Sequence, residues 1–274
     1  MTAQPLAPAD LLDAARLPGP LPIPGTANFR AAAPGAPGLR PGVLFRGDAP
    51  AHLGDEGRDA LVSLGIARLI DLRSDEEAAE APDDVADTGI AVHRVSIMAG
   101  SVRDAMAQLA GGAVPDLRSL YAMMLRDGGS AFGRALTLIA EGGATVVHCT
   151  AGKDRTGLAI ALALLAVGVD LETVVADYAR TEENLAGAWV ERMAARVARY
   201  GVALDGDLRE LVASSPAPAL RGAVQEVVLV NGSADAYLDG IGVDADVRAR
   251  LRAVLRADDA PDAVSAESAP TSAH

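Results

Sequence analysis

The apolar positions of the chain fall into short runs separated by longer segments with helical spacing. Four short runs predict strands, at residues 43–46, 67–72, 90–95 and 145–148, of which 67–72 is expected to be buried. Apolar residues three or four positions apart predict helices at residues 53–65, 117–125, 131–141, 156–167, 171–186, 188–200, 220–230 and 244–255. Strands that alternate with helices are typical of an α/β domain. We therefore expect a central, mainly parallel sheet of about four or five strands flanked by helices.

The two ends of the chain lack these patterns. Residues 1–20 are rich in Pro and Ala and predict a flexible leader, and residues 257–274 contain Ala, Ser, Asp and Pro without an apolar period, which predicts a disordered tail. Between them we find no long linker and no internal repeat. The pattern predicts one domain over residues 21–256.

Composition narrows the classes of function. Half of the 274 residues are hydrophobic, so a sizeable core can be buried. The net charge of −13 opposes binding to nucleic acid or to an anionic membrane, because both need positive patches. A small basic pocket in an acidic protein can still bind phosphate. The apolar stretch 158–169 is too short to span a bilayer, so we expect no stable membrane insertion.

Cysteine and histidine usage predicts neither a metal nor another cofactor. One cysteine excludes an intramolecular disulfide and a Cys-rich zinc site. The histidines outside the motif described next share no ligand spacing, and these are His52, His93 and His274. Residues 1–20 show no Sec signal peptide, so we expect a cytoplasmic protein, although export without a signal peptide stays open. We favour a monomer, but no pattern decides the oligomeric state.

The candidate chemistry lies in residues 148–157, which hold the single cysteine and the single lysine of the chain. Cys149 follows a predicted strand and precedes a predicted helix, and a helix N-terminus favours the reactive thiolate. Arg155, six positions later, can offer a planar fork to two phosphate oxygens. The alternative is that Cys149 is a small residue buried in the core that takes part in no reaction. We expect Cys149 to be a nucleophile that attacks phosphorus, with Arg155 holding the phosphate.

The residues between Cys149 and the helix would bind the substrate. Backbone N–H groups from Thr150 through Ala151 and Gly152 can curl around the oxygens of a phosphoryl group. Thr156 can donate a hydrogen bond to the sulfur, and His148 is expected to orient the loop. Lys153 adds an ammonium that suits a headgroup with more than one phosphate, although a solvated charge at the rim is the alternative.

The stretch 148–157 resembles the signature of the protein tyrosine phosphatases. Lys153 and Asp154 before Arg155 narrow the resemblance to the atypical bacterial group of mycobacterial phosphatase B and Listeria lipid phosphatase-like proteins. The segments 27–30, 44–48, 64–66, 70–74 and 175–178 fit the same group, whereas Gly47 stands where serine is usual, and the Asp-x-Gly-Gly run common after 28–30 is missing. The resemblance implies a cysteine-phosphatase fold. It also implies hydrolysis of phosphotyrosine, phosphoserine or phosphothreonine, and phosphoinositides through a thiophosphate on Cys149.

The general acid that protonates the leaving oxygen has three candidates. The resemblance favours Asp154, within the loop. Asp71 ends a predicted strand and could lie beside the loop, but a hydrogen-bonding brace for the strand end is an equal alternative. Asp116 lies 33 residues before Cys149, where a mobile acid loop could stand, and a solvated turn is its alternative. We rank Asp154 first, Asp71 second and Asp116 third as the general acid.

Two further alternatives concern movement and turnover. Residues 97–130 mix glycines with methionines and predict a helical lid over the site, or an ordinary core helix around residues 120–125.

Arsenate reduction would need further cysteines, which the chain lacks, and sulfur transfer has no need for the charged residues 153–155. A pseudo-phosphatase that binds a phosphorylated partner without turnover is the alternative from another class. The expected partners are therefore a phosphorylated protein or a phosphoinositide.

Overall fold

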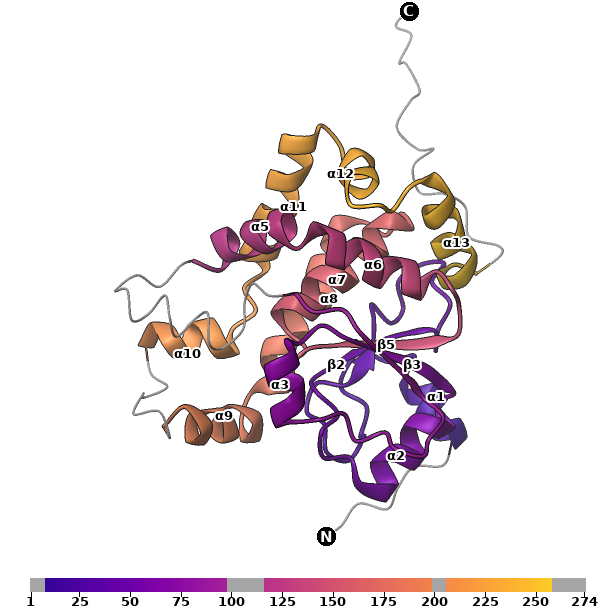
Figure 1. Cartoon of the computed structure of the whole chain (residues 1–274), viewed down its shortest axis with the longest axis vertical. Coiled ribbons are helices and arrows are strands. Elements are labelled where there is room, and N and C mark those ends of the chain that lie inside the picture. The colour runs from indigo at the N-terminus through magenta and orange to yellow at the C-terminus, as the bar shows by residue number, and fades with distance from the viewer. Residues whose placement is uncertain (1–7, 98–115, 199–205, 258–274) are drawn as a thin grey trace, which may run out of the picture.

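The computed structural model describes residues 8–97, 116–198 and 206–257 (Figure 1). Its centre is a five-stranded sheet in the order β1-β2-β5-β3-β4. The strands are β1 (Arg30–Ala31), β2 (Leu44–Gly47), β3 (Ile66–Asp71), β4 (Ala91–Arg94) and β5 (Ala144–His148). Only β1 pairs antiparallel with its neighbour in this sheet, and the other pairs are parallel. The predicted α/β class and mainly parallel sheet are confirmed.

The middle strand β5 brings the candidate loop to the centre of the sheet. Its last residue, His148, lies in register with Gly47 of β2 on one side and with Asp71 of β3 on the other. Val146 and Val147 are buried on opposite faces of the sheet, as expected for a central parallel strand. The carboxyl ends of β2, β5 and β3 therefore meet at one edge, which is where α/β proteins place their sites.

Helices cover both faces of this sheet (Figure 1). One face packs with α1 (Pro8–Ala14) and α2 (Gly54–Ser63) around a core that includes Leu11, Leu61 and Leu69. The other face packs with a larger group of helices that share one continuous core, namely α5 (Leu117–Asp127), α6 (Gly129–Ile139), α7 (Asp154–Ala166), α8 (Leu171–Leu185), α11 (Ala217–Asn231), α12 (Ala234–Gly240) and α13 (Ala245–Leu255). In the described part of the chain no helix is long and apolar enough to cross a bilayer.

The structure adds short elements that the sequence pattern did not predict. They are α1, β1, α12 and two helices near the site, α3 (Asp75–Glu80) and α10 (Gly206–Ala213). The expectation of a flexible leader over residues 1–20 is wrong for residues 8–14, because α1 buries Leu11 in the core beside α2. A helix with so few turns has too little periodicity to stand out among the surrounding prolines.

The predicted lid over residues 97–130 divides into two parts. Residues 98–115 lie outside the described residues. The remainder contains α5, which buries Leu120, Tyr121, Met124 and Leu125 in the main core and packs against α11. This part is the ordinary core helix that was the alternative to a lid.

Candidate active site

Cys149 stands at the end of β5, in a buried loop that runs into α7. Its side chain is 3% exposed, and α7 begins five residues later at Asp154. Gly152 adopts a φ of +68°, and a Cβ at this position would lie 2.3 Å from the carbonyl oxygen of Gly47. Glycine is therefore required here, because the loop turns tightly against the end of β2.

The β2 side of the loop is held through its carbonyl oxygens. Arg46 Nη2 donates to the oxygen of Gly152 at 2.9 Å, and Asn28 Nδ2 donates to the oxygens of Ala151 at 3.0 Å and Gly152 at 3.2 Å. In a trans peptide the C=O and N–H groups point in opposite directions. The N–H groups of Gly152 and Lys153 therefore point away from these donors, as a loop that binds an anion requires.

The donors on this side are fixed by a buried carboxylate. Arg46 Nη1 lies 2.7 Å from Asp177 Oδ2 of α8, and both side chains are at most 2% exposed. Arg30 donates to the carbonyl oxygen of Asp177 and to Thr181. Burial and the neighbouring Arg46 lower the pKa of Arg30 to about 9. Removing the carboxylate would leave two arginines buried without a counter-charge.

The β3 side of the loop meets the carboxylate of Glu77, on α3. Arg155 Nη1 and Nη2 donate to its two oxygens at 2.7 and 2.8 Å, and the hydroxyl of Thr150 donates to it at 2.6 Å. Glu77 also closes a capping box with Ser74 at the start of α3. A guanidinium has N–H groups beyond those that face one carboxylate. Glu77 therefore fixes the plane of Arg155 and leaves donors for a second anion.

This pair perturbs the pKa values of both partners. Burial raises the pKa of Glu77, but the hydrogen bonds and charge of Arg155 lower it by more, to about 2. Burial lowers the pKa of Arg155, but Glu77 and the neighbouring Cys149 and Asp154 raise it by more. The sequence analysis missed Glu77, which stands in an acidic run typical of a solvated helix. The available signal was the capping-box spacing from Ser74 to Glu77, which predicts a helix start but not the contact with Arg155.

Lys153 is not the solvated rim charge that was one alternative. Its side chain is 1% exposed. Nζ donates to the carbonyl oxygens of Leu211 at 2.7 Å and Ser214 at 2.8 Å and lies 3.1 Å from Asp154 Oδ1. Lysine thus ties the loop to α10 and the segment that follows it. In this arrangement its ammonium is engaged by protein groups.

Asp154, the first-ranked acid, is also engaged. Its Oδ1 accepts a hydrogen bond from the hydroxyl of Tyr121 on α5, in addition to the contact with Lys153. The hydroxyls of Tyr121 and Tyr178 lie 2.6 Å apart. Burial and the charge of Asp154 raise the pKa of Tyr121 well above its usual value, so the hydroxyl of Tyr121 donates to Asp154. Asp154 therefore links the loop to two core helices.

The two other candidate acids have different surroundings. Asp71 is fully buried, and its carboxylate accepts hydrogen bonds from the backbone and side chain of Arg73. Burial raises its pKa, but His148 and Arg73 lower it below the usual range. Asp71 is thus the brace at the end of β3, which was the alternative to an acid. Asp116 caps the start of α5 by accepting a hydrogen bond from Ser119. The hydrogen bonds from Ser119 lower the pKa of Asp116. Asp116 thus stands in an exposed turn, which was the alternative to an acid loop.

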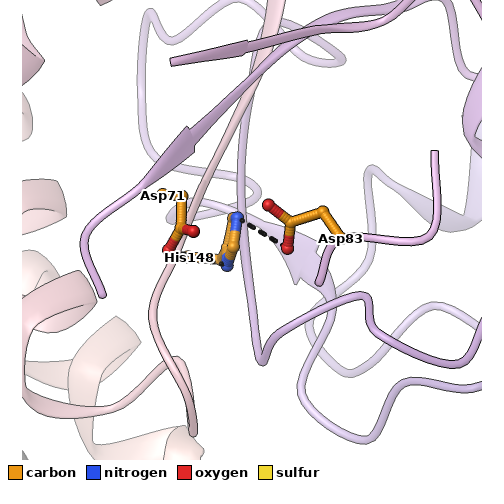
Figure 2. A group of neighbouring side chains, drawn as sticks. All are labelled: Asp71, Asp83 and His148. Carbon is orange, nitrogen blue, oxygen red and sulfur yellow. Dashed lines mark ion pairs between the residues drawn. The ribbon is translucent and has the colours of Figure 1, made fainter. Parts of the chain in front are cut away.

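His148, the residue before Cys149, lies between two carboxylates (Figure 2). Its Nδ1 is 3.9 Å from Asp71 and its Nε2 is 3.6 Å from Asp83, and all three side chains are at most 4% exposed. Three side chains of these types are enough to bind a metal ion. However, the guanidinium of Arg73 bonds both carboxylates, at 3.0 Å to Asp71 and 2.7 Å to Asp83. The two carboxylates are therefore explained as buried partners of Arg73, and His148 lies between them without a hydrogen bond from either ring nitrogen to any described residue.

A cleft of about 510 Å³ opens beside the loop. Thr150 and Glu77 line it from the loop and α3, and Asp48 lines it from the end of β2. α9 (Ala188–Ala198) contributes the opposite wall with Trp189, Arg192 and Met193. The cleft thus combines apolar side chains with two arginines, Arg73 and Arg192, and other polar groups, which suits an organic phosphate ester.

A parallel α/β sheet whose central strand ends in a cysteine-to-arginine loop, beside an ester-sized cleft, defines a phosphatase. Comparison with known proteins agrees: a model of the "tyrosine phosphatase family" matches residues 21–257. The chain belongs to this family. It is 30% identical over 279 residues to the "triple specificity protein phosphatase PtpB" of Mycobacterium tuberculosis. This alignment covers 85% of this chain and 98% of that protein.

Two further matches are more partial. The chain is 36% identical over 140 residues to a "tyrosine-protein phosphatase" of Nostoc commune, which covers 50% of this chain and 47% of that protein. Among solved structures, TpbA of Pseudomonas aeruginosa matches with a TM-score of 0.32 and 19% identity, over 62% of this chain and 84% of that one.

Proposed function

We propose that this chain is a cysteine-dependent phosphatase that hydrolyses phosphotyrosine, and also phosphoserine, phosphothreonine and phosphoinositides. The relative from M. tuberculosis is named a triple specificity phosphatase, which supports a broad substrate range. In the first step Cys149 Sγ forms a bond to phosphorus while the bond to the ester oxygen breaks, and that oxygen takes up a proton. In the second step water hydrolyses the S–P bond and releases phosphate.

The observation that carries the proposal is the geometry around Glu77. The forked side chain of Arg155 and the hydroxyl of Thr150 converge on one anionic group beside Cys149. A second anion, the phosphate, would meet the remaining guanidinium N–H groups and the backbone N–H groups of the loop. The charge that develops on the phosphoryl oxygens in the transition state would then face donors fixed in advance by burial.

Lys153 bears on phosphoinositides in a specific way. A second phosphate could meet its ammonium only if Nζ released Leu211 and Ser214. We therefore expect the lipid substrate to require displacement of the segment around α10, whereas a phosphotyrosine would not. Lys153→Gln should lower turnover of phosphatidylinositol phosphates more than turnover of a phosphotyrosine peptide, and equal losses would assign Lys153 a structural role alone.

The direct test compares wild type with Cys149→Ser and Arg155→Lys. Phosphate release is measured from a phosphotyrosine peptide and from vesicles of phosphatidylinositol phosphate. We expect release by wild type, none by Cys149→Ser, and a loss of about 10²-fold or more for Arg155→Lys, because lysine cannot replace a bidentate fork. Tight peptide binding by wild type without phosphate release would instead indicate a pseudo-phosphatase.

A further inference from the structure

A second pocket lies at the end of the sheet opposite to the phosphate loop. Its volume is about 190 Å³. Leu44 at the start of β2 and Leu164 near the end of α7 line this pocket, whereas the other ends of these elements, at Gly47 and Asp154, meet the phosphate loop. The distance along α7 from Asp154 to Leu164 is about 15 Å, because each helical residue rises 1.5 Å. A ligand in this pocket would therefore not touch a phosphate at the loop.

The lining of this pocket is apolar apart from two arginines. Its apolar part includes Leu255 of α13 and residues 31–36, which form β1 and the turn after it. Arg16 and Arg40 are exposed and stand at the rim, and no carboxylate is among the described residues that line the pocket. The nearest carboxylate oxygen to Arg16 in the described chain belongs to Asp13, at 3.9 Å, and both of these side chains are largely exposed. This lining suits a ligand with an apolar body and an anionic end.

Volume and charge together define the class of ligand. An apolar cavity of about 150 Å³ accepts a molecule of the size of benzene, so this pocket would take an apolar group of about six carbons. Arg40 Nη2 donates to the carbonyl oxygen of Arg256 at 3.0 Å. Arg16 is therefore the arginine of the rim that would pair with the anionic end. A carboxylate fits this role, because a guanidinium offers it a planar fork of donors.

The backbone that lines the pocket is bonded to the network that shapes the phosphate loop. The N–H group of Ala33 donates to Asp177 Oδ1 at 3.0 Å, and Oδ2 of the same carboxylate accepts from Arg46 Nη1 at 2.7 Å. Arg46 Nη2 in turn donates to the carbonyl oxygen of Gly152 at 2.9 Å. Two buried side chains, one on α8 and one on β2, thus connect the lining of the pocket with the phosphate loop.

Ala33 stands in an unfavourable backbone conformation at this connection. Its φ is +43°, in the left-handed region that alanine rarely adopts. Such a conformation persists only where surrounding contacts hold it. Here the N–H group of Ala33 is bonded to Asp177, and the N–H group of Ala32 donates to the carbonyl oxygen of Leu44 at 3.0 Å. A molecule that packs against residues 31–36 would add to these contacts and hold Ala33 against Asp177.

We propose that this pocket binds a small apolar carboxylate, and that the bound carboxylate strengthens phosphate binding at the loop. The coupling rests on the proposed function, whereas the binding of the carboxylate does not. The apolar part of the ligand would pack against Leu44, Leu164 and Leu255, and its carboxylate would pair with Arg16. By linkage, phosphate must raise the affinity for the carboxylate by the same factor by which the carboxylate raises the affinity for phosphate. The alternative is a gap in the packing that binds no ligand.

Hexanoate is the probe, and its binding to the ¹⁵N-labelled wild-type chain is followed by NMR with and without saturating inorganic phosphate. We expect hexanoate to shift the amide resonances of residues 31–36, and its Kd to fall about 5-fold or more when phosphate is present. Hexylamine has the same chain with the opposite charge and should leave these resonances unchanged. Hexanoate bound at the phosphate loop would instead compete with phosphate. A Kd that rises with phosphate, or no response of residues 31–36, would overturn the proposal.

Two variants test the two halves of the site. Arg16→Gln removes the charge at an exposed position and should weaken hexanoate binding about 5-fold. Ala36→Leu adds volume to a partly buried residue of the lining and should abolish hexanoate binding. Arg126→Gln is the matched control, because Arg126 is likewise exposed beside an aspartate, Asp127, but does not line the pocket. All three variants should release phosphate from a phosphotyrosine peptide at the wild-type rate without hexanoate. Equal hexanoate binding by all of them would contradict the assignment.

The two proposals fail in different ways. If phosphate shifts no amide resonance in residues 149–156, the proposed function is contradicted, while hexanoate would still titrate residues 31–36. If phosphate binds at the loop and the Kd of hexanoate stays the same, the pocket is not connected to the loop and the coupling is wrong. The proposed function would stand in that second case.

Discussion

The two sides of the phosphate loop are built from similar residues but contact it in different ways. On the β2 side, Asn28 and Arg46 bind backbone carbonyl oxygens, and Asp177 balances the charge. On the β3 side, Glu77 binds the side chains of Thr150 and Arg155. The first set therefore determines the shape of the loop, and the second determines the orientation of the Arg155 side chain. Variants on the two sides should fail in different assays.

The largest effect is expected from the buried carboxylate of the β2 side. Asp177→Asn would leave the buried Arg46 and Arg30 without a counter-charge and should lower the free energy of unfolding by about 3–5 kcal/mol. Denaturant unfolding gives this value. The control is Glu172→Gln on the same helix, whose exposed partner is Arg221, and this should cost less than about 1 kcal/mol. Similar losses in the two variants would contradict the account of the β2 side.

The next effect concerns the shape of the loop itself. In Gly152→Ala the new Cβ would meet the carbonyl oxygen of Gly47 at 2.3 Å, so the loop must shift. A shift of this size at a reacting centre should lower kcat/KM by about 10²-fold. Gly168→Ala is the control, because its φ is +81° but no atom lies within 4 Å of the new Cβ. That variant should lose stability without losing activity per folded molecule.

On the β3 side we expect a smaller loss of stability, together with a loss of activity. Glu77→Gln keeps the size of the side chain but removes the charge that fixes Arg155. We expect kcat/KM to fall about 10- to 100-fold, because the guanidinium is no longer held in one plane. Circular dichroism should change little, and the loss of stability at neutral pH should be smaller than that of Asp177→Asn. A stability loss as large as that of Asp177→Asn would remove the distinction between the two sides.

Glu77 also makes the stability of the β3 side depend on pH. Its pKa is about 2 in the folded protein against 4.5 ordinarily, so the ionised carboxylate stabilises the fold at neutral pH. This contribution is present above about pH 4.5 and is lost as the pH falls toward about 2. The difference in unfolding free energy between wild type and Glu77→Gln should therefore shrink over that range. A difference that stays constant with pH would show that ionisation of Glu77 does not contribute.

The smallest effect should come from the hydroxyl that connects the loop to α5. Tyr121→Phe removes the donor to Asp154 and should cost about 1 kcal/mol of stability. The ring stays buried, so the fold should persist. Thermal unfolding measures this change, and an effect above that of Asp177→Asn would reverse the order proposed for the two sides.

The sequence predicted four of the five strands, and the central ones are short apolar runs that stand out from their surroundings. The Val-Val-His end of β5 and the Arg-Leu-Ile-Asp run of β3 are examples. The order of the strands could not be predicted, since residues far apart in the chain are paired. The short helices α1 and α3 were missed, because their stability depends on contacts that no local pattern contains.

The site was predicted unevenly for a similar reason. Cys149, Arg155 and Gly152 share one stretch, and a local motif reveals them. Glu77 belongs to another segment and meets Arg155 only through the packing of α3. Lys153 illustrates a different limit: its presence in the motif was plain, but the carbonyl oxygens that it binds come from residues about 60 positions away. A position in a motif predicts proximity to phosphate and does not predict the direction of the side chain.

The burial of Lys153 has a practical consequence for chemical labelling. It is the single lysine of the sequence, and its ammonium is bonded to α10 and the segment after it. Apart from a terminal amine, the folded chain offers no other primary amine to an acylating reagent. The rate at which such a reagent modifies Lys153, followed by mass spectrometry of one peptide, therefore reports how often the segment around α10 separates from the phosphate loop.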